Sequence, residues 1–127
     1  MKLDDLEVYR LSMDLSDAVW EIVLKWEYFP KDTIGKQWTR AMDSVSANIS
    51  EGFGRNSFKD SRTFYYYARG SLYESKTWFE KAQRRNLIPD EVSVDMLERF
   101  NKLGIKINNF INAHEKLIEK SNSNNKQ

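Results

Sequence analysis

The chain contains no cysteine, which excludes a disulfide framework, thiol catalysis and metal sites built on cysteine. Two prolines and five glycines supply few of the turns that an all-β fold requires. The single histidine, His114, argues against a conventional zinc site, and we expect it at the edge of the core or on the surface. Di-iron bundles carry Glu-x-x-His, but Ile111 takes the glutamate position here. We therefore expect no catalytic residue, no metal and no cofactor.

Long apolar runs are also missing. The longest, 64–68, has five residues, far fewer than a membrane span requires. Residues 1–7 are acidic and lack the apolar segment of a signal peptide. We expect a cytoplasmic protein with no membrane partner.

Apolar residues instead recur at three- and four-residue steps, which is typical of amphipathic helices. Phe29-Pro30 is expected to end the first helix, because the residue before proline is pushed out of the helical region. Ser57 and Asp60 resemble a capping box at the start of the third helix. The predicted helices span residues 5–28, 33–53, 58–86 and 90–120, and Leu97 is expected to face the core from the last of them.

The short connections between these segments favour antiparallel neighbours. The sequence therefore predicts one all-α domain over residues 1–120, an antiparallel up-down-up-down four-helix bundle. Residues 121–127 are polar and low in complexity, and we expect a disordered tail there.

Two polar patches, 48–52 and 70–74, interrupt the apolar stripes of the second and third helices. In a hairpin that turns near Arg55, Arg40 lies level with Gly70 and about one turn from Glu74. We expect Gly70 to let the helices approach and Arg40 to pair with Glu74. The predicted structural polar network comprises Arg40, Asn48, Glu51, Gly70, Ser71 and Glu74. A ligand or catalytic site at these residues is the alternative.

Charge is unevenly distributed along the chain. Residues 1–30 carry three Lys/Arg and seven Asp/Glu, whereas residues 57–88 carry seven and three. Basic residues beside tyrosines form a candidate nucleic-acid interface, and an ordinary solvated face is the alternative. The basic residues are Arg55, Lys59, Arg62, Arg69, Lys76, Lys81, Arg84 and Arg85.

Apolar residues also lie on a second face of two helices. Met13, Trp20 and Leu24 do so in the first helix, and Tyr66 and Tyr73 in the third. These five are the candidate oligomer interface, hence the expectation of self-association. The alternative is that the tyrosines are simply half exposed.

The polar motifs also carry a family resemblance. They are Leu6-Glu-Val-Tyr9-Arg, Gln37-Trp-Thr-Arg40-Ala, Ser44-Val-Ser46, Asn48-Ile-Ser-Glu51-Gly-Phe-Gly54-Arg, Ser57-Phe-Lys-Asp60 and Ala68-Arg-Gly70-Ser-Leu-Tyr-Glu74. Together they resemble the bacterial four-helix-bundle family of ribosomal RNA intervening-sequence proteins. That family is similar to the accessory variability proteins of diversity-generating retroelements. The resemblance covers residues 3–85, and departs at Tyr9, usually tryptophan, and at Ser46-Ala47, commonly Pro-Ser.

The resemblance implies a homopentameric ring with RNA or a nucleoprotein as candidate partner, and it supplies no catalytic residues. The sequence thus predicts a non-enzymatic, ring-forming scaffold or adaptor. One alternative is an enzymatic or ligand-binding bundle that uses Asn48, Glu51, Arg40 and Glu74. Another is an antitoxin-like partner of a second protein.

Overall fold

The computed structural model describes residues 1–125, and helices are the only regular elements in that range. Four of the helices are long. The elements are a 3₁₀ turn (Leu3–Asp5), α1 (Glu7–Leu24), α2 (Tyr28–Pro30), a π-helical turn η2 (Lys31–Gly35), α3 (Lys36–Phe53), α4 (Phe58–Arg84) and α5 (Asp90–Asn125).

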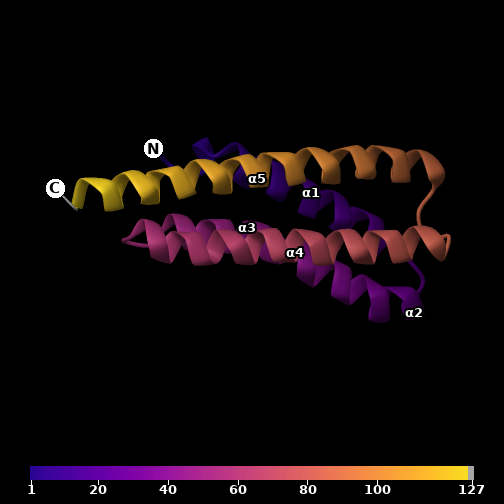
Figure 1. Cartoon of the computed structure of the whole chain (residues 1–127). Helices are drawn as coiled ribbons and strands as arrows, with labels where there is room; N and C mark the ends of the chain where they lie inside the picture. The colour runs from indigo at the N-terminus through magenta and orange to yellow at the C-terminus, as the bar shows by residue number, and fades with distance from the viewer. Residues whose placement is uncertain (126–127) are drawn as a thin grey trace.

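The long helices α1, α3, α4 and α5 lie side by side as a bundle, and successive ones are joined at alternate ends (Figure 1). The most extensive packing is between α3 and α4, followed by α1 with α3 and α4 with α5. α1 also contacts α5, which closes the bundle around one core. Within residues 1–125, no helix combines the length and apolarity needed to cross a bilayer.

Pro30 begins a helix instead of ending one, which corrects the first predicted boundary. α1 stops at Leu24, and Glu27 is extended before α2 starts. Pro30 is the third residue of α2, where backbone N–H groups have no intrahelical partner and proline is tolerated. The π-helical turn then leads directly into α3, so the second helical stretch starts five residues earlier than predicted.

The third predicted helix, 58–86, corresponds to α4. Ser57 Oγ accepts a hydrogen bond from the backbone N–H of Asp60 at 3.1 Å, as its capping position requires. At the other end, Asn86 has a φ of 58°, a left-handed conformation that terminates helices.

The last helix is longer than predicted. α5 continues to Asn125, so residues 121–125 of the expected disordered tail are helical, and residues 126–127 lie outside the described residues. Leu97 was expected to face inward, but it is exposed and its neighbour Met96 is buried.

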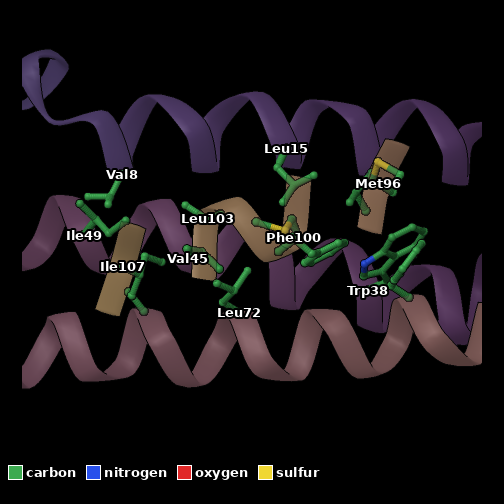
Figure 2. Packing of buried hydrophobic residues seen from close by; sticks show 14 of the residues in the cluster. Val8, Leu15, Trp38, Val45, Ile49, Leu72, Met96, Phe100, Leu103 and Ile107 are labelled. Carbon is green, nitrogen blue, oxygen red and sulfur yellow. The ribbon is translucent and has the colours of Figure 1, made fainter. Parts of the chain in front are cut away.

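An aromatic stack lies near one end of the core, and aliphatic residues run along its length. Trp38 is fully buried, with its ring centroid 5.9 Å from that of Trp26 and 6.1 Å from that of Phe79. Phe79 stacks in turn on Phe100 at 5.2 Å. Figure 2 shows aliphatic residues from all four long helices continuing this core, with Val8 at the opposite end from Trp38.

Candidate functional site

The polar patch of α3 is hydrogen-bonded within the protein. Asn48 Nδ2 donates to both the backbone oxygen and the Oγ of Ser44, each at 2.9 Å. Ser44 Oγ lies 2.9 Å from Ser71 Oγ of α4, and all three side chains are partly buried. Asn48 and Ser71 therefore belong to one hydrogen-bond network that links the two helices. Such a network favours one register of α3 against α4.

The close approach of α3 and α4 occurs at Gly52 and not at Gly70. A Cβ on Gly52 would lie 2.6 Å from Tyr65 Cε1 and 3.0 Å from the backbone oxygen of Ser61, so only glycine fits without displacement. A Cβ on Gly70 would meet nothing within 4 Å. The predicted role of Gly70 in bringing α3 against α4 is therefore wrong.

Arg40 and Glu74 do not form the predicted ion pair. Both are exposed, and Glu74 Oε2 accepts a hydrogen bond from Trp78 Nε1 on its own helix at 3.2 Å. Among residues 1–125, no ion pair or hydrogen bond is recorded for the Arg40 side chain.

The register of the hairpin also differs from the predicted one. Ser75 Oγ donates to Met42 Sδ at 3.2 Å, and Trp38 contacts Phe79. These pairs place Arg40 level with a position about two helical turns beyond Gly70. Gly52, near the end of α3, meets Tyr65, so the first turn of α4 extends past the end of α3.

Glu51 forms a local ion pair instead of a link to α4. It accepts a hydrogen bond from Arg55 one turn later, and the Arg55 guanidinium lies 4.4 Å from the centroid of the Phe64 ring. Exposed pairs of this kind contribute little to stability. Glu51 is thus a surface residue at the end of α3 and not part of a buried network.

Two of the predicted nucleic-acid-binding residues are held by α5. Arg62 Nη1 lies 3.2 Å from Glu115 Oε2, and Arg69 donates to Asn108 Oδ1 at 3.4 Å. Tyr66 also donates to Glu115 at 3.0 Å, which raises the pKa of the Tyr66 phenol because the carboxylate favours the protonated hydroxyl.

The other basic residues separate along α4. Lys59 lies in the first turn, and Lys81, Arg84 and Arg85 lie around the last. Lys81 is 5.9 Å from the centroid of Trp78. Within the described part of the chain, no ion pair is recorded for Lys59, Lys76, Arg84 or Arg85.

The five candidate interface residues are all exposed. Tyr73 is 61% exposed and Trp20 52%, high values for aromatic rings, and Met13, Leu24 and Tyr66 are each at least 39% exposed. The expected second faces therefore exist, and the interface itself remains a prediction.

His114 sits in an aromatic setting that the sequence indicated only as a position at the edge of the core. It is buried, and its Nε2 lies 2.7 Å from the backbone oxygen of Phe58, where it donates a hydrogen bond. Edge contacts to Phe58 and Tyr65 complete its surroundings. Within residues 1–125, no cluster of three or more potential metal-ligating side chains is present.

The chain is similar to known proteins in both fold and sequence. A protein of unknown function from the S23 ribosomal protein family of Bacteroides thetaiotaomicron has a similar fold, with a TM-score of 0.74 and 20% sequence identity. The match covers 82% of this chain and 97% of that one. No curated protein matches, and the similarity to accessory variability proteins stays a prediction. The model of the 23S rRNA-intervening sequence proteins matches residues 4–109, and the chain therefore belongs to that family.

Proposed function

We propose that the chain is a non-enzymatic scaffold whose antiparallel bundle assembles into a homopentameric ring. The observation that carries this proposal is the set of exposed apolar side chains on α1 and α4, chiefly Trp20, Leu24 and Tyr73. Exposed aromatic rings on a small bundle mark contact surfaces, because burying them against a second subunit removes apolar area from water.

The polar cluster supports a scaffold over an enzyme. Asn48 is bonded to Ser44, while Glu51, Arg40 and Glu74 are exposed at different levels of the bundle. Arg40 and Glu51 line separate surface hollows, and Glu74 lines neither. A catalytic or ligand site requires such groups to converge on one cavity.

RNA in the cytoplasm is the partner that the exposed basic residues favour. Arg84 and Arg85 are exposed at one end of α4 and Lys59 at the other. A ring repeats each group, so weak phosphate contacts from one subunit become a multivalent surface. A nucleoprotein partner would meet the same charges through its RNA.

Sedimentation velocity at low micromolar concentration tests the assembly. The expected result is a species of five times the chain mass, and a monomer would refute the ring.

Binding of a structured RNA, followed by fluorescence anisotropy across salt concentrations, tests the partner. We expect affinity to fall with salt and to weaken further when Arg84 and Arg85 are both replaced by Glu, because phosphate contacts release counterions. Lys116→Glu, an exposed reversal on α5, is the matched control. Undetectable or salt-insensitive binding would exclude RNA as the partner.

A further inference from the structure

α1 presents an acidic, apolar ridge to solvent. Asp17, Trp20 and Leu24 follow one another at three- and four-residue steps and therefore share one face of the helix. Glu21 lies beside them, and all four side chains are exposed. Within residues 1–125, no ion pair is recorded for Asp17 or Glu21. We call these four residues the α1 ridge.

A groove with the opposite character lies between α4 and α5. Tyr73 and Ile105 stand on its two sides, 61% and 62% exposed. Arg69 and Lys76 supply positive charge, and Asn108 holds Arg69 in place. We call this surface the α4–α5 groove; it is lined by Arg69, Leu72, Tyr73, Lys76, Phe100, Asn101, Gly104, Ile105 and Asn108.

One glycine lies in this groove and another lies beside it on α4. Gly104 lines the groove, and Gly70 lies on α4 one turn before Tyr73. Glycine destabilises a helix interior relative to alanine, and a Cβ on either residue would meet nothing within 4 Å. Packing inside the chain therefore gives no reason for glycine at either position, whereas the close approach of another chain does.

We propose that the α1 ridge of one copy of this chain docks into the α4–α5 groove of the next copy. This inference rests on the proposed ring and specifies which surfaces form it. The ridge and the groove have opposite charge and both expose apolar side chains, which is the complementarity a specific interface requires. The contact is heterologous, so a docked pair of copies still has one free groove and one free ridge, and such contacts form a ring where the rotation between copies closes.

The ridge borders a hollow that also holds Asp43, with Lys31, Lys36 and Arg40 in its lining. Burial raises the pKa of Asp43 on α3, and the negative charge of Asp17 raises it further. Arg40 lies in the same hollow as Asp43, but no ion pair joins the two within the described residues. Lys76 from a second copy would place a cation beside these carboxylates and relieve the repulsion.

Mixing two single-face variants tests the proposal. Trp20→Lys blocks the ridge and leaves the groove, whereas Ile105→Lys blocks the groove and leaves the ridge. Both positions are exposed, so each variant should keep its helical circular dichroism spectrum. Leu117→Lys is the matched control, an exposed apolar position 12 residues further along α5 and about 120° around the helix.

We expect the Trp20 and Ile105 variants each to be monomeric by sedimentation, and an equimolar mixture to form dimers of one intact interface. The Leu117 variant should assemble like the wild-type chain. An Ile105 variant that assembles normally, or a mixture that stays monomeric, would contradict docking of the α1 ridge into the α4–α5 groove. Neither result would contradict the ring itself. A monomeric wild-type chain overturns both.

Discussion

The inside of the α3–α4 hairpin and the outer faces of the bundle differ in how their polar groups are used. Inside, Asn48, Ser44 and Ser71 are bonded to one another, and Gly52 fits against Tyr65. Outside, Trp20 and Tyr73 are exposed. Asn48 and Ser71, which look like part of a site, link the two helices, whereas the less distinctive surface residues are available to partners.

Among substitutions inside the bundle, Trp38→Ala should lower the free energy of unfolding the most. It removes a fully buried indole from the stack with Trp26 and Phe79, and we expect a loss of about 3–5 kcal/mol in the free energy of unfolding. Urea denaturation at one fixed protein concentration measures it, because assembly adds to apparent stability. Trp38→Phe should cost less, since it keeps a ring there. Equal losses for the two variants would contradict this packing.

Gly52→Ala and Gly70→Ala should have opposite effects. The added methyl at Gly52 meets Tyr65 and the Ser61 backbone, so we expect destabilisation of about 1–3 kcal/mol. At Gly70 the methyl meets open space, and we expect a gain of up to about 1 kcal/mol from helix propensity. Thermal unfolding of both variants, compared in a Trp20→Lys background to remove assembly, measures the contrast. Gains at both positions would mean that the helices are not in close contact at Gly52.

Ser71→Ala should have a moderate effect. It removes the hydroxyl that bonds to Ser44 across the helix interface, and we expect a cost of about 0.5–1.5 kcal/mol. A double-mutant cycle with Ser44→Ala isolates the pair. Strict additivity in that cycle would show that the two hydroxyls do not interact.

Arg40→Ala and Glu74→Ala should have the smallest effect. Both side chains are exposed, and within residues 1–125 no ion pair joins them. We expect each substitution to change stability by no more than about 0.5 kcal/mol, and the double variant to be additive within a similar margin. A coupling of several kcal/mol would restore the ion pair that the sequence suggested.

Helix content was predictable from sequence because apolar periodicity is a local signal. The Ser57 cap and the α4 span follow from the same kind of local pattern. The helix boundary predicted at Pro30 was wrong because proline can end a helix but is also tolerated in its first turn. The inward position predicted for Leu97 was wrong because Met96 beside it is also apolar, and periodicity alone does not show which of the two faces the core.

The hairpin register was not predictable from sequence. Counting outward from the turn assumes that both helices start level, whereas the first turn of α4 extends past the end of α3. That offset places Gly70 about two turns from the level of Arg40, whereas Glu74 lies three residues before that level instead of four beyond it. His114 was located only approximately, because its partner is a backbone oxygen 56 residues earlier, a contact that no local pattern encodes.

The most direct test of assembly through the α1 ridge is acrylamide quenching of Trp20 fluorescence. The Trp20 signal is the difference between the wild-type chain and Trp20→Phe. Trp20 is half exposed in the single chain. Assembly through the α1 ridge predicts that its quenching falls steeply as protein concentration rises through the low micromolar range. Quenching of Trp20 that stays at the single-chain level at every concentration would contradict the account.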